Sequence, residues 1–277
     1  MKQSNKVAAI QMVSGIEVAA NLVAAERLIL QAADAGARLI VLPENFALMG
    51  MTEFDKLDYI EQAGSGLIQD FLARVSASCN SWIVAGTLPF VSSSDDKILA
   101  ACFVYDDQGQ QVARYDKIHL FDVNVPDSDE QYMESATIEA GNQPLVIDTP
   151  FGRLGVAVCY DLRFPELFRQ MLSAGMELLA VPAAFTKKTG RDHWALLVRA
   201  RAVENLCYVI ASNQGGDHEN GRQTFGDSMI VDPWGQVLTR LAQGEGLVSA
   251  EIDLDSVKKV RTTFPVVEHR RIQCELA

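Results

Sequence analysis

The sequence predicts one domain of the α/β or α+β class. Short apolar runs rich in Val and Ile alternate along the chain with stretches whose apolar residues recur at helical spacing. No low-complexity linker interrupts the 277 residues, and single α/β domains reach this length. Both halves mix strands with helices, which suggests two sheets packed face to face with helices outside. Periodicity alone establishes only the class. We expect a single domain over residues 1–277, with a core at about 6–255 and a C-terminal tail at 256–277.

The first half alternates strands and helices. An apolar run predicts a strand over residues 6–12. The next stretch predicts a helix over 17–36, with Leu22, Leu28 and Ile29 on one stripe and Gly36 as a stop signal. The further elements expected in this half are a strand at 38–43, a helix at 67–79 and strands at 82–88, 100–106 and 111–115, the last two joined by a hairpin turn at 106–109.

The second half repeats this style. A strand over residues 154–159 is followed by a helix over 165–173, because Pro165 suits a first helical turn and Gly175 suits a stop. Between the halves, residues 121–141 show no clear periodicity, and loops of that length in compact domains are often functional. The remaining expected elements are strands at 178–182, 208–212, 227–231, 237–239 and 247–252, and a helix at 193–206.

Charge and cysteine content exclude several classes. The formal net charge of -12 argues against nucleic-acid binding and gives no basic patch for a membrane surface. No apolar stretch is long enough to span a bilayer, and the N-terminus predicts a strand, not a signal peptide. A cytoplasmic location is therefore expected, and scattered cysteines fit a reducing compartment. No metal-ligand spacing appears among them. They are Cys79, Cys102, Cys159, Cys207 and Cys274.

Cys159 ends the apolar strand predicted over residues 154–159, shortly before the predicted helix. A cysteine at such a turn lies at the sheet edge and near a helix N-terminus, whose partial positive charge favours the thiolate. The alternative interpretation is a small buried hydrophobic residue, as free cysteines often are. The local pattern makes Cys159 a candidate nucleophile without deciding between the two.

Two charged residues also follow predicted strands. Glu44 comes directly after a fully apolar strand, where partial desolvation would raise its pKa toward the range of a general base. Lys117 closes another strand, where its positive charge would favour a thiolate and stabilise an oxyanion. The alternative interpretations are a solvated loop glutamate and a surface lysine.

Three sequence blocks together resemble the signature motifs of the nitrilase (carbon–nitrogen hydrolase) superfamily, and they occur in that family's order. The resemblance covers nearly the whole chain, from about Lys6 to Arg271. It implies a four-layer αββα sandwich and a Glu-Lys-Cys triad. The blocks are Pro43-Glu44, Lys117-Ile-His-Leu-Phe and Val158-Cys159-Tyr-Asp-Leu-Arg-Phe-Pro-Glu.

The resemblance also implies a mechanism. Glu44 would take the thiol proton, and Cys159 would attack an amide carbonyl. Lys117 and the backbone N–H of Tyr160 would hold the oxyanion. The amine would leave with the proton from Glu44, and water activated by Glu44 would hydrolyse the thioester. No metal and no organic cofactor is expected.

A second glutamate of the family lies in the loop after the lysine. Glu134 matches that place best, and Glu130 and then Glu139 are the alternatives. We expect Glu134 to position Lys117 or the substrate, unless it is a solvated loop carboxylate. His119 is expected to anchor the loop and not to take part in the chemistry.

Further segments resemble the branch of the superfamily that cleaves deaminated glutathione to 2-oxoglutarate and cysteinylglycine. With no synthetase domain and no membrane helices, supply of ammonia to a fused partner and lipoprotein acylation are not expected. The related ω-amidase branch, which acts on α-ketoglutaramate or α-ketosuccinamate, remains an alternative, although residues 217–222 and 264–271 favour the first. The segments are 159–167, 181–186, 193–194, 199–205, 228–235 and 267–271.

The expected substrate is a small acidic amide, so a local basic group must meet it despite the negative net charge. Arg163 is near Cys159 in sequence, and a guanidinium suits bidentate carboxylate binding. The alternative is that Arg163 pairs with Glu166 or Glu204. A basic segment follows the strand expected over 178–182. The expected substrate contacts are Tyr160, Arg163, Phe185 and Thr186, together with one or more of Lys187, Lys188, Arg191 and His193.

Two functions from other classes are alternatives to an amidase. A non-catalytic binding protein on this fold would be expected to lack a triad residue, and all three are present. A cysteine protease would need a histidine partner for Cys159, and none of the four histidines lies in a supporting motif. We expect a homodimer or higher homo-oligomer, because family members usually dimerise through helices of the layer that holds residues 199–204.

Overall fold

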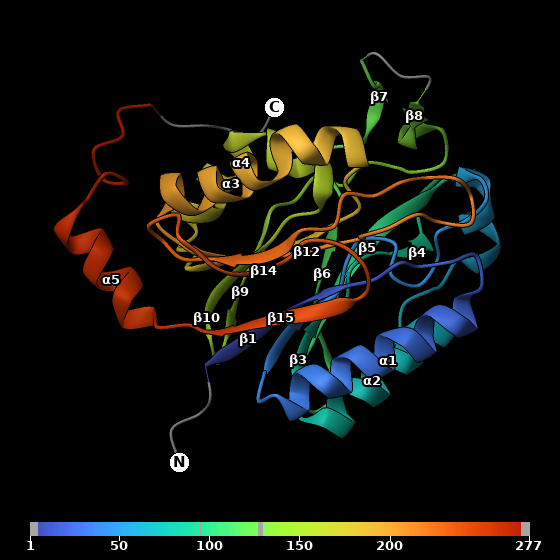
Figure 1. Ribbon diagram of the computed structural model, residues 1–277, viewed down its shortest axis with the longest axis horizontal. Coiled ribbons are helices and arrows are strands. Elements are labelled where there is room, and N and C mark those ends of the chain that lie inside the picture. The colour runs from blue at the N-terminus through green and yellow to red at the C-terminus, as the bar shows by residue number, and fades with distance from the viewer. Residues whose placement is uncertain (1–4, 95, 127–129, 273–277) are drawn as a thin grey trace.

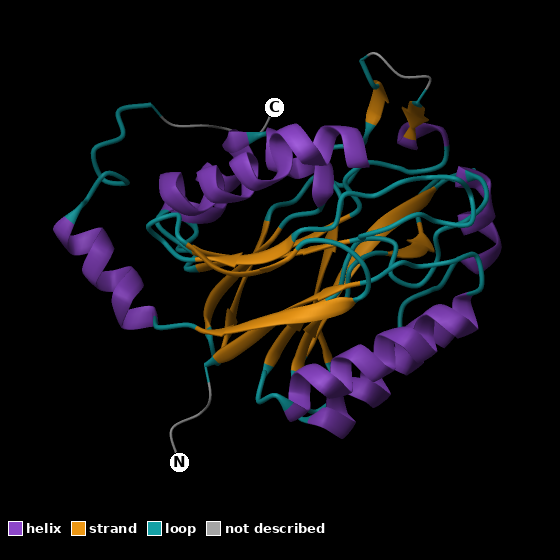
Figure 2. Cartoon of the chain, viewed as in Figure 1, coloured by secondary structure: helices purple, strands orange, loops and turns teal. Residues whose placement is uncertain are grey.

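The computed structural model describes residues 5–94, 96–126 and 130–272. They form four layers, with two sheets face to face and a helical layer outside each (Figures 1 and 2). The layering confirms the expected αββα sandwich. The helices of one outer layer are α1 (Val18–Asp34) and α2 (Leu67–Cys79), and those of the other are α3 (Pro165–Ser173) and α4 (Lys187–Asn205).

The first sheet is built from the first half of the chain and one strand of the second. Its first three strands pair in parallel, and the last strand of the chain joins its edge by pairing antiparallel with β1. The order is β15-β1-β2-β3-β5-β4, and β6 also pairs with β5. The strands are β1 (Lys6–Gln11), β2 (Leu39–Val41), β3 (Trp82–Val84), β4 (Leu88–Val91), β5 (Ile98–Tyr105), β6 (Gln111–Asp116) and β15 (Gly246–Glu251).

The second sheet has the order β14-β13-β12-β11-β10-β9. Its three strands β10, β11 and β12 are parallel, as in the first sheet. The strands are β9 (Leu145–Thr149), β10 (Gly152–Val156), β11 (Leu178–Ala183), β12 (Tyr208–Asn213), β13 (Ser228–Val231) and β14 (Val237–Leu241).

Central strands are continuously apolar because both of their faces are buried. In β1, Val7 and Ala9 face the core between the two sheets. Ala8 and Ile10 face the core beneath α1 and α2. This alternation places two hydrophobic cores on either side of one sheet, which is why strict polar–apolar alternation is missing from the sequence.

Several elements differ from the sequence expectation. The strand expected at 82–88 is divided into β3 and β4, and the helix expected from residue 193 begins six residues earlier, at Lys187. Thr186 caps that earlier start by accepting a hydrogen bond from the backbone N–H of Thr189. The hydrophobic pattern did not predict β9. It also missed a hairpin within the long loop, formed by β7 (Asp122–Asn124) and β8 (Gln131–Met133), and the helix α5 (Leu254–Thr263) in the expected tail.

No helix within the three described segments combines the length and apolar character that crossing a bilayer requires.

Candidate active site

Cys159 lies in a tight, strained turn. β10 ends at Val156, and Cys159 begins a short 3-10 turn, η3 (Cys159–Arg163), with a backbone φ of 48°. This left-handed conformation is unfavourable for a non-glycine residue and persists only where surrounding structure enforces it. The strand expected to run to Cys159 therefore stops earlier, and the turn aims the thiol away from the sheet core.

Asp161 enforces this turn from beneath. Its side chain is fully buried and accepts hydrogen bonds from the backbone N–H of Val158 at 2.8 Å and from the hydroxyl of Tyr115 at 2.7 Å. The backbone N–H of His119 donates to it at 3.1 Å, and the His119 ring contacts it at 2.7 Å. One carboxylate thus joins the Cys159 turn to the segment after Lys117. The contacts of His119 agree with its expected anchoring role.

Glu44 follows β2 and is only 3% exposed, so it is not a solvated loop glutamate. Its turn packs against Gly86, where a Cβ atom would come within 2.1 Å of the carbonyl oxygen of Pro43. Gly86 also has a positive φ of 57°. The break between β3 and β4 therefore makes room for the Glu44 turn. The Glu44 backbone carbonyl accepts a hydrogen bond from Gln214 at 3.1 Å.

Lys117 directly follows β6 and is 1% exposed, so it is not a surface lysine. Its Nζ donates to Glu44 Oε1 at 2.8 Å and to both carboxylate oxygens of Glu134 at 2.8 Å each. Glu134 also accepts a hydrogen bond from the backbone N–H of Phe121 at 2.7 Å. Of the three candidate glutamates, Glu134 is thus the one that contacts Lys117. Glu130 contacts Tyr132, and Glu139 contacts Ser93.

Glu44 and Lys117 fix each other's protonation state. Burial alone would raise the pKa of Glu44, but the Lys117 ammonium outweighs it and the pKa is lowered. The expectation of a raised Glu44 pKa was therefore wrong. Burial alone would lower the pKa of Lys117, yet Glu134 and Glu44 raise it well above its usual range. The resting cluster is an ammonium ion between two carboxylates.

Cys159 is a thiol in this environment. Burial and then the negative charge of Glu44 raise its pKa well above the usual range, and Lys117 opposes this only in part. Lys117 favours the thiolate, as expected, but burial and the charge of Glu44 outweigh its effect. A neutral thiol beside an ionised glutamate needs proton transfer before it can attack a carbonyl carbon.

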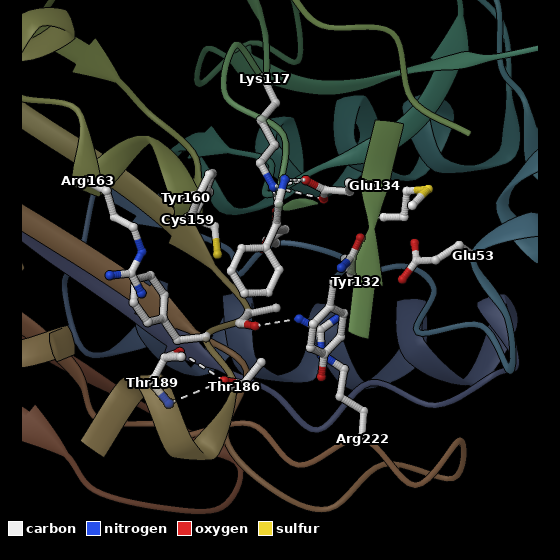
Figure 3. Close-up of a pocket in the computed structure, with 16 residues that line it drawn as sticks. Glu53, Lys117, Tyr132, Glu134, Cys159, Tyr160, Arg163, Thr186, Thr189 and Arg222 are labelled. Atoms are coloured by element: carbon white, nitrogen blue, oxygen red, sulfur yellow. Dashed lines mark hydrogen bonds and ion pairs between the residues drawn. The ribbon is translucent and has the colours of Figure 1, made fainter. Parts of the chain in front are cut away.

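These four residues line a pocket with about 460 Å³ of empty space, counted to its open mouth. Figure 3 shows Lys117, Glu134 and Cys159 projecting into it. Arg163, Tyr160, Phe185 and Thr186 were also expected to contact substrate, and all line the same pocket. The complete lining is Glu44, Asn45, Glu53, Lys117, Phe121, Tyr132, Met133, Glu134, Cys159, Tyr160, Arg163, Ala184, Phe185, Thr186, Thr189 and Arg222.

The basic segment after β11 contributes less than expected. Lys187 and Arg191 are exposed outside the pocket, and Arg191 pairs with Asp192 at 3.0 Å. Lys188 is also outside and donates to the backbone carbonyl of Pro126. His193 lies behind Arg163, which it contacts at 3.2 Å. None of these four residues is among those that line the pocket, and all four lie in α4, which begins at Lys187.

Arg163 has an open guanidinium at the pocket wall. It lies against the rings of Tyr160 and Phe185, at 5.7 and 5.4 Å from their centres. The alternative that it pairs with Glu166 or Glu204 is wrong. Glu204 instead pairs with Arg201 at 2.5 Å and Arg169 at 3.5 Å, and among the described residues no carboxylate lies within ion-pair distance of Arg163.

Eight lining residues were not identified from the sequence. The clearest is Arg222, in a loop that had been noted only as a feature of one family branch. In the sequence, Arg222 lies between two glycines in a segment without periodicity, and this pattern does not predict where its side chain points. The others are Asn45, Glu53, Phe121, Tyr132, Met133, Ala184 and Thr189.

A family model described as carbon-nitrogen hydrolase matches residues 6–262. Among curated proteins, the deaminated glutathione amidase of Synechocystis sp. is 45% identical over 266 residues, covering 95% of this chain and 97% of that protein. The deaminated glutathione amidase of Yersinia enterocolitica is 40% identical over 277 residues, covering 100% of this chain and 96% of that protein.

Solved structures agree with the fold. The crystal structure of Saccharomyces cerevisiae Nit3, described as a member of branch 10 of the nitrilase superfamily, superposes with a TM-score of 0.87 at 30% sequence identity. The match covers 98% of this chain and 97% of that one. Likeness therefore extends over both sheets and both helical layers, and is not confined to the pocket.

Proposed function

Because the chain belongs to the carbon–nitrogen hydrolase family and is an amidase of that family, we propose that it cleaves deaminated glutathione to 2-oxoglutarate and cysteinylglycine. The observation that carries the proposal is a buried thiol beside the Glu44–Lys117 pair in a pocket with basic side chains. The names of its nearly full-length relatives support the choice of substrate.

The first half-reaction follows from the resting protonation states. Ionised Glu44 takes the proton of the Cys159 thiol as sulfur attacks the amide carbonyl carbon. The oxyanion is stabilised by the ammonium of Lys117 and the backbone N–H of Tyr160. When the tetrahedral intermediate collapses, the C–N bond breaks and the nitrogen takes the proton from Glu44. A neutral amine and an acyl thioester on Cys159 result.

The second half-reaction regenerates the thiol. Glu44 takes a proton from a water molecule as the water oxygen attacks the thioester carbonyl carbon. Collapse breaks the C–S bond, and sulfur takes the proton back from Glu44. Glu134 acts through Lys117, since two hydrogen bonds to Nζ hold the ammonium in position. Side chains alone supply this chemistry, so no cofactor is expected.

The acyl half of the substrate carries a carboxylate beside its keto group. We assign this carboxylate to Arg163, whose guanidinium is held by two aromatic rings. Thr186 and Thr189 line the same side of the pocket at the N-terminus of α4, where a helix dipole favours negative charge. Together they form the acyl-side anion subsite.

Steady-state release of 2-oxoglutarate from deaminated glutathione and from α-ketoglutaramate tests the proposal, with Cys159→Ala as the control. Faster turnover of deaminated glutathione is the expected result. A clear preference for α-ketoglutaramate would instead make the protein an ω-amidase. Cleavage of neither would remove the substrate assignment. Absence of any amidase activity would favour a binding protein on this fold.

We also propose a homodimer through α4. Leu196 and Val203 are one heptad apart on this helix and are 68% and 47% exposed. Val203 adjoins the turn at Gly235, next to Trp234, whose ring packs on Phe264 at 5.4 Å. The last two rings are at least half exposed. Large exposed apolar side chains of this kind on and beside one helix are typical of a surface that a second copy covers.

We place the protein in the cytoplasm as one hydrolase domain. Cys79, Cys102, Cys159 and Cys207 are free thiols, which supports a reducing compartment. Cys274 lies outside the described residues. The family match over residues 6–262 supports a single domain over 1–277. The net charge of -12 supports a small-molecule substrate over nucleic acid or an anionic membrane.

A further inference from the structure

We infer that the pocket contains a second anion subsite, formed by Arg222 and Tyr132, which binds a carboxylate on the leaving amine. This inference rests on the proposed function and deepens it. The enzyme would prefer linear amides with a carboxylate on each side of the scissile bond over primary amides, whose leaving group is ammonia.

The loop that carries Arg222 is held firmly at its base. The buried His218 ring contacts the carbonyl oxygen of Ser14 and the hydroxyl of Thr224, each at 2.8 Å. The backbone N–H of His218 donates to the carbonyl of Arg222 at 2.9 Å. The backbone N–H of Arg222 in turn donates to Asn220 Oδ1 at 2.9 Å. These contacts fix where the arginine side chain begins.

The guanidinium of Arg222 has donors to spare. One Nη donates to the carbonyl oxygen of Ala184 at 2.8 Å, and the Tyr132 ring lies 5.1 Å from the guanidinium carbon. Nε is buried without a hydrogen-bond partner. Within the described segments no carboxylate lies within ion-pair distance of Arg222. A buried donor left unpaired is costly, and a carboxylate reaching it from the pocket would remove that cost.

The nearby carboxylate of Glu53 influences Arg222 through space, but its direct ion pair is with Lys56. Glu53 lines the pocket, but it pairs with the buried Lys56 at 2.7 Å. Burial tends to raise the pKa of Glu53, but the Lys56 ammonium has the larger effect and lowers it. Glu53 and Lys56 therefore neutralise each other, and Arg222 retains a net positive charge for a ligand.

The two arginines lie on opposite sides of the reacting thiol. In Figure 3, Arg163 and Arg222 enter the pocket from opposite sides, with Cys159 and Lys117 between them. Arg222 is also among the charges that lower the pKa of Glu44. Arg163 is assigned to the keto-acid carboxylate of the acyl half, so the opposite side of the pocket, where Arg222 lies, is the leaving-group side. An amide that is anionic at both ends would thus span the pocket.

Substrates that differ at one group test this assignment. Deaminated glutathione carries the distal carboxylate, its C-terminal glycinamide analogue lacks only that charge, and α-ketoglutaramate lacks the whole dipeptide. In Arg222→Gln, kcat/KM for deaminated glutathione should fall by about 10- to 100-fold, the effect of one charge-assisted contact. The same variant should lower kcat/KM for the other two amides by a clearly smaller factor, because they lack the distal carboxylate.

Matched variants separate charge from shape. Arg222→Lys keeps the charge and should recover part of the loss. Tyr132→Phe keeps the ring that lies against Arg222, so it should lower kcat/KM for deaminated glutathione less than Arg222→Gln does. Arg163→Gln should lower kcat/KM for all three substrates, because all carry the keto-acid carboxylate. Arg74→Gln, which removes an exposed arginine that pairs with Glu26 outside the pocket, is the surface control.

Two kinetic outcomes would overturn the subsite. An equal loss in Arg222→Gln for all three amides would mean that Arg222 only positions Ala184. No loss for deaminated glutathione would mean that the carboxylate binds elsewhere.

A binding measurement separates this inference from the proposed function. Cys159→Ala is titrated with deaminated glutathione and with the glycinamide analogue, so that no turnover is needed. The subsite predicts about tenfold or tighter binding of the acid, lost in Cys159→Ala/Arg222→Gln. If that pattern appears although the unmodified protein hydrolyses neither, the proposed function fails and the subsite stands. If the preference persists without Arg222, or is absent, the subsite is wrong whatever the activity.

Discussion

Nζ of Lys117 lies 2.8 Å from Oε1 of Glu44, and both side chains are almost completely buried. Such a pair is costly to break, because either charge left alone would be buried without compensation. Glu134 adds a second carboxylate to the same ammonium. The arrangement keeps Glu44 ionised as a base while the neighbouring Cys159 stays protonated.

Lys117→Met should destabilise the fold by about 3–5 kcal/mol at pH 7, because Glu44 and Glu134 lose their cation. In the unmodified protein the pKa of Glu44 is lowered, so its ionisation stabilises the fold above the unfolded value of about 4.3 and this is lost as pH falls. In the variant the cation is gone, so burial raises the pKa of Glu44 above its unfolded value. The free energy of unfolding therefore falls as pH rises from about 4.3 to the raised pKa.

Urea unfolding at pH 4.5 and pH 7 measures this difference. The stability deficit of Lys117→Met should be smaller at the lower pH. A deficit of equal size at both pH values would show that lost packing, and not an uncompensated carboxylate, dominates.

Glu44→Gln should abolish most turnover while making the thiol more acidic. Turnover falls because general-base catalysis contributes roughly 10²- to 10⁴-fold. Thiol acidity rises because the negative charge of Glu44 helps to raise the pKa of Cys159. Alkylation by iodoacetamide should therefore reach its high-pH rate at lower pH in the variant. An alkylation profile unchanged by the substitution would contradict this account.

Asp161→Asn should lower kcat more than it raises KM, because Asp161 shapes the Cys159 turn without lining the pocket. Loss of accepted hydrogen bonds should also cost about 1–3 kcal/mol of stability. Tyr115→Phe, which removes one of those donors, is the matched control and should have a smaller effect. A normal kcat in Asp161→Asn would show that the strained turn holds without this carboxylate.

Leu196→Glu should convert the proposed dimer into a monomer, because it replaces the most exposed apolar side chain of α4 with a charge. Sedimentation velocity measures the change, and Val23→Glu on exposed α1 is the control at an equally exposed position. A dimer that survives Leu196→Glu, or a monomer without any substitution, would remove α4 as the interface.

The sequence predicts a residue's position correctly where a local pattern alone determines it. Glu44 follows an apolar strand and Lys117 follows another strand, and the ends of strands in the two sheets meet at the pocket. Their alignment with Cys159 required family resemblance, because periodicity carries no information about which strand ends meet. The helical stripe of Leu22, Leu28 and Ile29 was predicted correctly, since a buried face imposes its own spacing.

Long-range contacts explain what the sequence did not reveal. The Glu44 pKa depends on an ammonium 73 residues away, and burial alone predicts the wrong sign. Lys187 and Arg191 belong to a basic segment of the sequence, but its pattern does not reveal that Thr186 caps a helix that begins at Lys187. Arg222 was overlooked because its direction depends on His218 contacting Ser14, 204 residues earlier.

The central claim is that Cys159 carries the acyl group during turnover. Rapid acid quench of the enzyme with deaminated glutathione, followed by peptide mass spectrometry, measures this directly, and hydroxylamine sensitivity identifies a thioester. We predict a hydroxylamine-sensitive 2-oxoglutaryl adduct on the peptide containing Cys159, absent from Cys159→Ala. Steady hydrolysis by Cys159→Ala, or an adduct on another residue, would contradict the account.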